Sequence, residues 1–256
     1  MTSDNVGVTR STIRLVSTLS ALALVTVGCG GPNTAVVTPS TNPTPSLPAP
    51  EPDARTRLAG QIAAAKDERY TASYLLTGPD NVGRTVTVVL AQDGSWRVDI
   101  PGGARGGTVD VSIAGNSDGV FQCTSSCVWV AAPGEPIPAE IDPRVHHLFT
   151  DWLDVLLDRQ AALSVAPADP LPGSQGTCYS VEPTTVSLTP PMDSGIYCYL
   201  DNGVLTAAQF SPGVLVLIGE PGPAPESVAL PAPIAPAGTS PVPTSPPPPS
   251  PTPDLP

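Results

Sequence analysis

The chain has 256 residues, of which 35 are proline, and its 11 basic and 23 acidic side chains give a net charge of −12. Phosphate backbones select lysine and arginine, so this balance argues against a nucleic-acid partner. Seven prolines fall in residues 30–53 and fifteen in residues 221–256. Because proline has no N–H donor and clashes with the preceding turn, neither flank can carry a helical bundle or a coiled coil.

Residues 1–28 have the pattern of a lipoprotein signal peptide. Arg10 and Arg14 precede thirteen uncharged residues, 15–27, a run too short to span a bilayer but suited to a signal peptide. Residues 25–29 resemble a lipobox that ends at Cys29. We expect Cys29 to carry lipid, palmitate included, and to anchor the protein on the extracytoplasmic face of the plasma membrane. The alternative is an uncleaved anchor, or a secretory signal with an incidental cysteine.

The composition then divides the chain into a folded middle and two disordered flanks. Residues 29–53 continue from Cys29 as a spacer rich in Pro and Thr, and residues 235–256 form a Pro-rich tail. Such segments bury too little apolar surface to offset the cost of ordering, which predicts disorder in both. The domain itself is expected between them, over residues 54–234.

Within this domain the patterns predict one helix followed mainly by strands. Residues 54–68 carry Leu58, Ile62 and Ala65 at helical spacing. Alternating or β-branched segments separated by turn residues predict strands over residues 70–77, 84–91, 96–100, 108–114, 120–123, 127–131, 177–182, 195–200, 204–210 and 213–218. Short turns between successive strands indicate an antiparallel sheet covered by helices, an α+β fold.

A second helix is expected to interrupt the strands. Asp142 is a suitable N-cap with Pro143 in the first turn, and an apolar stripe runs from Val145 to Leu157. On this helix His147 would lie on the solvated face beside Asp151.

Four cysteines follow Cys29 and allow three pairings. An extracytoplasmic location permits disulfides, and proximity in sequence favours Cys123–Cys127 and Cys178–Cys198. Metal binding at the first pair is disfavoured because no histidine or second close cysteine pair accompanies it.

No enzyme constellation is evident. Residues 115–119 match the G-x-S-x-G nucleophile elbow, but a strand is expected after them instead of the required helix, and no histidine follows His147. We therefore interpret the motif as a β-turn. His146 and His147 would point about 100° apart on a helix and could not chelate together. We expect no catalytic residue, cofactor or metal.

The order of anchor, spacer, helix, strands, amphipathic helix and further strands resembles the LolA-like lipoproteins of actinobacteria, the LprG/LppX group. The resemblance covers roughly residues 54–234, and it is carried by the lipobox at Cys29, the 70–100 β-meander, and Cys178-Tyr179 with Tyr197-Cys198-Tyr199 before 201–205. It implies a curved antiparallel half-barrel with helices packed on the concave face, and an apolar cavity that binds acyl chains. The implied function is to carry or present lipids or lipoproteins in the cell envelope.

The predicted cavity would be lined by apolar side chains of the strands and the second helix, namely Leu75, Val86, Val88, Val98, Val111, Leu148, Trp152 and Leu156. The periodicity of the apolar residues identifies a buried face, but it does not show whether that face lines an empty cavity. The alternative is a non-enzymatic interaction or sensory module with a filled core and no lipid ligand. In either case we expect a monomer whose membrane contact is the lipidated Cys29.

Overall fold

The computed structural model describes residues 52–185 and 190–246. The signal peptide, Cys29 and the spacer to residue 51 lie outside the described residues. The elements in chain order are α1 (Ala54–Asp67), β1 (Tyr70–Thr77), β2 (Gly83–Leu90), β3 (Trp96–Ala104), the 3-10 turn η1 (Arg105–Gly107), β4 (Val109–Asn116), β5 (Gly119–Cys123), β6 (Cys127–Ala131), the 3-10 turn η2 (Val145–Phe149), α2 (Asp151–Leu157), β7 (Leu163–Pro167), β8 (Thr177–Pro183), β9 (Gly195–Tyr199), β10 (Leu205–Phe210) and β11 (Gly213–Pro223).

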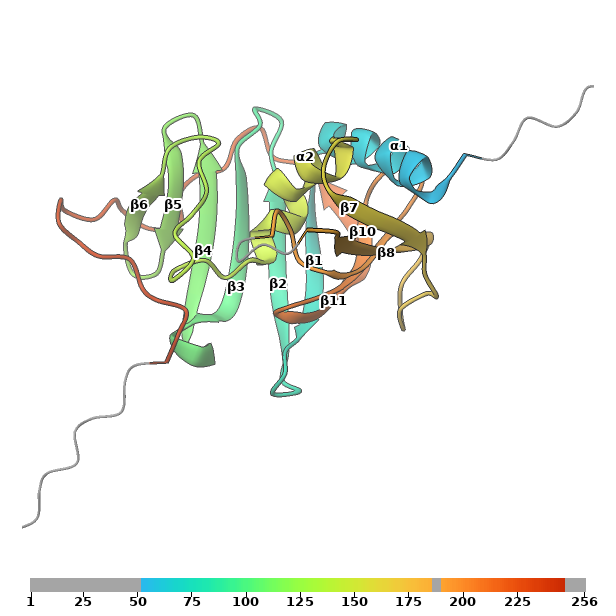
Figure 1. Cartoon of the computed structure of the whole chain (residues 1–256). Helices are drawn as coiled ribbons and strands as arrows, with labels where there is room; N and C mark the ends of the chain where they lie inside the picture. Colours follow the sequence, from blue (N-terminus) through green and yellow to red (C-terminus); the bar gives the residue numbers. More distant parts are fainter. Residues whose placement is uncertain (1–51, 186–189, 247–256) are drawn as a thin grey trace, which may run out of the picture. The chain divides into compact units, whose positions relative to one another are not determined.

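The strands of the described residues form one open antiparallel sheet, which is curved (Figure 1). Its order is β6-β5-β4-β3-β2-β1-β11-β10-β9-β8-β7. Two meanders, β1 to β6 and β7 to β11, are therefore joined at the centre by the β1–β11 pair. The chain between β6 and β7 must travel from one edge of the sheet to the other, and it carries η2 and α2 on the way. This topology confirms the α+β class.

The first helix begins and packs as its sequence predicts. Asp53 caps it, with a carboxylate oxygen accepting a hydrogen bond from Thr56 N at 2.9 Å. Leu58, Ile62 and Ala65 are buried in the main core. The helix contacts α2 and β7, and Figure 1 shows α1 and α2 side by side.

The strand predictions are confirmed within one to a few residues, with one omission. β7 was missed because its five residues include a proline, which weakens a strand signal. That proline is tolerated because β7 is an edge strand. The G-x-S-x-G motif forms the β4–β5 hairpin turn, in which Asn116 Oδ1 accepts a hydrogen bond from Asp118 N at 2.8 Å.

The long second helix is wrong as predicted. Arg144 has a left-handed backbone, with φ 65°, and Thr150 has φ −130° and ψ −113°. These two breaks divide the segment into η2 and the seven-residue α2. Asp142 lies before the first break, where its carboxylate accepts a hydrogen bond from Arg144 N at 2.7 Å. All five residues of η2 are buried, because the turn faces the sheet rather than solvent.

Residues 235–246 of the tail, which the sequence predicts to be disordered, make hydrogen bonds to the domain, whereas residues 247–256 of the tail lie outside the described residues. Ala235 N donates to Cys127 O at 2.8 Å, and Thr244 N donates to Glu140 O at 2.9 Å. Gln122 both donates to Val242 O (2.9 Å) and accepts from Val242 N (2.6 Å). Proline removes a donor but leaves the carbonyl groups and the neighbouring N–H groups free to bond. The segment therefore docks near edge strand β6 and covers part of an edge that would otherwise be exposed.

Candidate functional site

The residues predicted to line an acyl-chain cavity instead fill the core. Val86, Val88, Val98, Val111, Leu148, Trp152 and Leu156 are buried together in the main hydrophobic cluster. Leu75 is 41% exposed, because Tyr74 and Leu76 on either side of it in β1 face the core. Its assignment to the cavity was wrong by one residue of register. None of the eight lines the pocket described next.

This pocket, of about 450 Å³, opens beside the core. Its walls come from the C-terminal end of α1, the turns at the ends of β2 to β5, the loop over residues 133–137, and η2 with α2. The apolar part of the wall consists of Leu90, Trp96, Val120, Ile137, Phe149 and Leu153. Polar groups also line the pocket, among them the paired Lys66 and Asp154 and the two adjacent histidines.

The two histidines stand inside a column of stacked rings. Trp96 stacks on His146 with ring centroids 5.6 Å apart, and the rings of His146 and His147 are 4.1 Å apart. His147 in turn stacks on Trp152 at 5.2 Å. Each tryptophan therefore stacks on one imidazole, and the planes of the two imidazoles are tilted by 34° from each other. The prediction that His147 lies on a solvated face is wrong: it is 8% exposed and His146 is 3% exposed.

Both imidazoles also meet the carboxylate of Asp142. His147 Nε2 lies 2.8 Å from Asp142 Oδ2, and His147 Nδ1 lies 2.6 Å from Asp151 Oδ1. His146 Nδ1 lies 3.8 Å from Asp142 Oδ1. The sequence argument that adjacent histidines diverge fails, because it assumed a regular helix where the chain forms a 3-10 turn after a left-handed residue.

These surroundings shift the pKa values of the two imidazoles in opposite directions. Burial, reinforced by the nearby His147, lowers the pKa of His146 to about 3. Burial also lowers the pKa of His147, but hydrogen bonds and the charges of Asp142 and Asp151 outweigh it and raise this pKa to about 9. For Asp142 burial raises the pKa, yet the hydrogen bond from His147 and the nearby charges leave it below the usual value.

The Arg144 guanidinium, which lies beside this cluster, is paired with Asp193. The Arg144 guanidinium lies 5.6 Å from the centre of the Trp152 ring, and its Nη2 donates to Asp193 Oδ1 at 2.5 Å. Asp193 also accepts from the Ser211 hydroxyl at 2.6 Å. Asp193 therefore balances the Arg144 charge, and the carboxylates of Asp142 and Asp151 keep the histidine cluster acidic.

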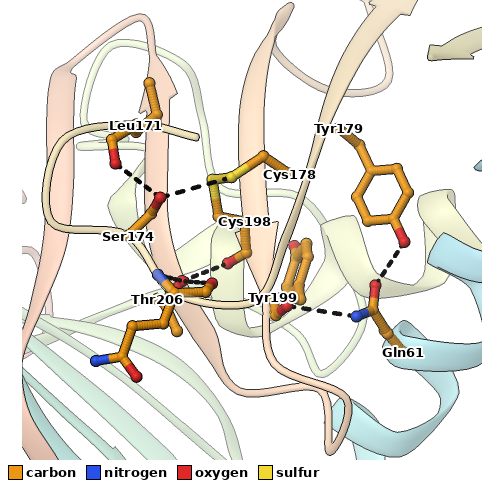
Figure 2. Close-up of a disulfide and its surroundings, with 9 residues drawn as sticks. Gln61, Leu171, Ser174, Cys178, Tyr179, Cys198, Tyr199 and Thr206 are labelled. Atoms are coloured by element: carbon orange, nitrogen blue, oxygen red, sulfur yellow. Dashed lines mark hydrogen bonds between the residues drawn. A yellow bond between two sulfur atoms is a disulfide. The ribbon is translucent and has the colours of Figure 1, made fainter. Parts of the chain in front are cut away.

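The two predicted cysteine pairs lie at disulfide distance, Cys123–Cys127 and Cys178–Cys198. The second joins directly opposed residues of β8 and β9. Figure 2 shows its surroundings, where Gln61 of α1 donates to Tyr199 O (3.3 Å) and accepts from the Tyr179 hydroxyl (2.8 Å). This end of the sheet is a structural joint between α1 and strands β8 and β9.

Sequence reasoning found the individual residues of the histidine cluster but not their convergence. A residue before proline avoids the helical region, which suits the N-cap of a helix as well as an extended residue, so Asp142 before Pro143 did not distinguish the two. Nothing in the sequence indicated the left-handed Arg144, which brings the cluster together.

Comparison with protein-family models and with curated proteins found no match to this chain. Within residues 52–185 and 190–246, no helix has the length and apolar character needed to cross a membrane.

Proposed function

We propose that this protein is a membrane-anchored envelope lipoprotein that binds the apolar part of a lipid or lipoprotein in the pocket between the β2–β5 turns and η2–α2, and that carries or presents it. In this proposal the sheet is a LolA-like half-barrel with η2 and α2 on its concave face. The lipid on Cys29 would hold the domain at the extracytoplasmic face of the plasma membrane, with no catalytic role for the domain.

The observation that carries the proposal is the pocket of about 450 Å³ whose lining includes large apolar side chains and a few charged groups. Its volume falls in the size class of ligand sites, which are mostly apolar with a few polar groups that orient the ligand. Trp96 and Phe149 offer aromatic surface, and the Lys66–Asp154 pair marks the polar side. An amphiphile would place its chain against the first and its headgroup near the second.

The filled core favours a second candidate, a non-enzymatic interaction or sensory module without a lipid ligand. Seven of the eight side chains expected to enclose acyl chains are buried together in the main hydrophobic cluster, which supports this candidate. The two candidates differ in whether the pocket beside the core takes up lipid.

The pocket is tested by placing a charge in its wall. Ile137 lines the pocket and is 8% exposed, whereas Ile234 is 64% exposed and lies outside it. Ile137→Arg puts a guanidinium where an acyl chain would have to desolvate it, and Ile234→Arg is the matched control. In full-length protein stripped of lipid, we expect uptake of a fluorescent fatty acid by the wild type and by the control. Ile137→Arg should weaken uptake about tenfold or more, which corresponds to roughly 1.4 kcal/mol.

Native mass spectrometry of protein purified from its membrane supplies the second readout. Lipid that co-purifies with the wild type and is lost in Ile137→Arg supports carriage. A folded, delipidated wild type that takes up no lipid would leave the interaction module standing. Equal uptake by the two arginine variants would exclude this pocket as the lipid site.

The anchor is tested separately. Cys29→Ala removes the thiol that would be acylated, so the protein should leave the detergent phase or remain unprocessed. Ser17→Ala, which keeps the signal segment uncharged, is the control. A wild-type protein whose intact mass begins at Met1, or that begins at Cys29 without added acyl mass, would contradict lipidation.

A further inference from the structure

We propose that Asp142, His146 and His147 form a binding site for one divalent transition-metal ion of the zinc class, with Asp151 as the residue that orients His147. The site goes beyond the proposed lipid binding and does not depend on it. Its argument rests on the convergence of three donor atoms, on a buried nitrogen without a partner, and on the carboxylate behind His147.

The three donor groups already converge. One ligand atom from each of the three residues lies within 4.8 Å of the others, and all three residues are buried. The nearest pairs are His147 Nε2 with Asp142 Oδ2 at 2.8 Å and His146 Nδ1 with Asp142 Oδ1 at 3.8 Å. Ligand atoms about 2.0–2.2 Å from a tetrahedral metal lie roughly 3.4 Å from one another. The two separations from Asp142 lie on either side of that value, and the histidine nitrogens lie within 4.8 Å of each other, so the donors are close to the spacing that a metal ion requires.

His146 supplies the independent observation that points to a ligand. Among the described residues, its Nδ1 is the one buried side-chain nitrogen or oxygen atom without a hydrogen-bond partner. The His146 side chain is 3% exposed, and this nitrogen points toward the carboxylate of Asp142. A buried polar atom without a partner is unfavourable unless something binds it. A metal ion between His146 and Asp142 would satisfy it.

His147 has the arrangement that metal-binding histidines commonly have. Its Nδ1 bonds to Asp151 Oδ1, which also accepts from the Thr150 hydroxyl at 2.9 Å. With Nδ1–H donating to Asp151 Oδ1, the lone pair of Nε2 points at the Asp142 carboxylate. Two electron-rich groups at this distance need a proton or a cation between them. A carboxylate on the outer nitrogen is the usual means of fixing the tautomer and orientation of a ligating imidazole.

The donor set selects the class of metal. Two imidazoles and one carboxylate suit zinc, nickel, copper, cobalt or ferrous iron, whereas calcium and magnesium prefer oxygen ligands alone. Three protein ligands leave one position for water or for a group of a bound molecule. Both histidines line the 450 Å³ pocket, so a molecule bound there would lie beside two of the three ligands. Trp96 and Trp152 confine the two rings from either side.

The test uses the full-length protein in detergent after dialysis against a chelator, with Zn²⁺ as the titrant and Co²⁺ as a spectroscopic probe. We expect one equivalent of Zn²⁺ to bind, to raise the melting temperature, and to displace Co²⁺ whose absorption indicates nitrogen and oxygen ligands. His147→Gln and Asp142→Asn should each abolish the binding of Zn²⁺ and Co²⁺. Asp158→Asn, which alters an exposed carboxylate just after α2, should bind as the wild type does.

Asp151→Asn keeps the test decisive if a buried variant fails to fold. Asp151 is exposed, and its loss removes only the orienting carboxylate, so Zn²⁺ affinity should fall about 10- to 100-fold with the same stoichiometry. A folded wild type that binds neither Zn²⁺ nor Co²⁺ would overturn the proposal. So would unchanged affinity in Asp151→Asn, or a folded His147→Gln that binds like the wild type, since either result would place the metal elsewhere.

Discussion

The glycine of the β9–β10 turn makes the most direct test of how α1 is held. Gly203 has φ +88°, and a Cβ added there would lie 2.6 Å from Ala65 Cα and nearer still to Ala65 N and Gln61 O in the α1 backbone. Gly94, in the β2–β3 turn, has nearly the same φ, +85°, but nothing lies within 4 Å of its Cβ position. Gly203→Ala and Gly94→Ala therefore share the backbone strain and differ in the clash with α1.

The expected magnitudes follow from these two terms. A left-handed backbone costs an alanine about 1–2 kcal/mol, which is the full effect expected for Gly94→Ala. Overpacking adds about 1–3 kcal/mol at Gly203, because backbone atoms of a helix cannot rotate away as a side chain does. Gly203→Ala should thus lower the free energy of unfolding by roughly 2–5 kcal/mol. Gly60 lies in α1 with open space at its Cβ position. Gly60→Ala should therefore raise the free energy of unfolding by about 0.5–1 kcal/mol.

The assay is urea unfolding followed by circular dichroism, with the disulfides intact and the slope against urea compared among variants. For a domain of this size each kcal/mol moves the melting temperature by about 2–4 °C, so the three variants are separable by heat as well. Equal destabilisation by Gly203→Ala and Gly94→Ala would refute the close contact between this turn and α1. A destabilising Gly60→Ala would refute the open helical environment assigned to that residue.

Three further predictions concern the joints of the fold. Non-reducing peptide mapping should recover Cys178 linked to Cys198, and free thiols would contradict this pairing. Changing both cysteines to serine should lower the free energy of unfolding by about 3 kcal/mol, because the bond closes a loop with a sequence separation of 20. Gln122→Leu should cost about 1–3 kcal/mol and speed amide hydrogen exchange in residues 235–246, since it leaves buried backbone groups without partners; unaltered exchange there would show that the tail is held by other contacts. Asp193→Ala should cost about 2–3 kcal/mol in urea unfolding, less than the roughly 3–5 kcal/mol of a fully buried pair because the Arg144 side chain is 36% exposed; a neutral effect would mean that solvent replaces the carboxylate.

Much of the fold could be read from local signals. Asp53 caps α1, strand alternation marks β1 to β6, and the β4–β5 turn is formed by turn residues despite its likeness to a nucleophile elbow. The cysteine pairs also follow from proximity, since hairpin neighbours in sequence become neighbours in space. These features depend on residues close together in the chain, so local sequence patterns are enough to predict them.

The tail and the core depend on contacts between residues that are far apart in the sequence, which local patterns do not report. Proline content predicted disorder for residues 235–246, yet docking depends on partners such as Gln122, more than a hundred residues away. Periodicity placed Val86 and Leu148 on a buried face, but whether that face encloses a cavity depends on how side chains from many elements fill it. Packing of this kind is decided only when all elements are in place.

The histidine cluster depends on both the local sequence and the tertiary packing. Sequence alone supplied Asp142, His146 and His147, and an apolar stripe that would bury the segment. Tertiary structure alone turned the chain left-handed at Arg144 and stacked the imidazoles between Trp96 and Trp152. The left-handed backbone costs free energy locally, and the Arg144–Asp193 pair and the ring column supply contacts that offset it. Asp193 and Trp96, which make two of those contacts, lie far from Arg144 in the sequence, so no local pattern indicates the site.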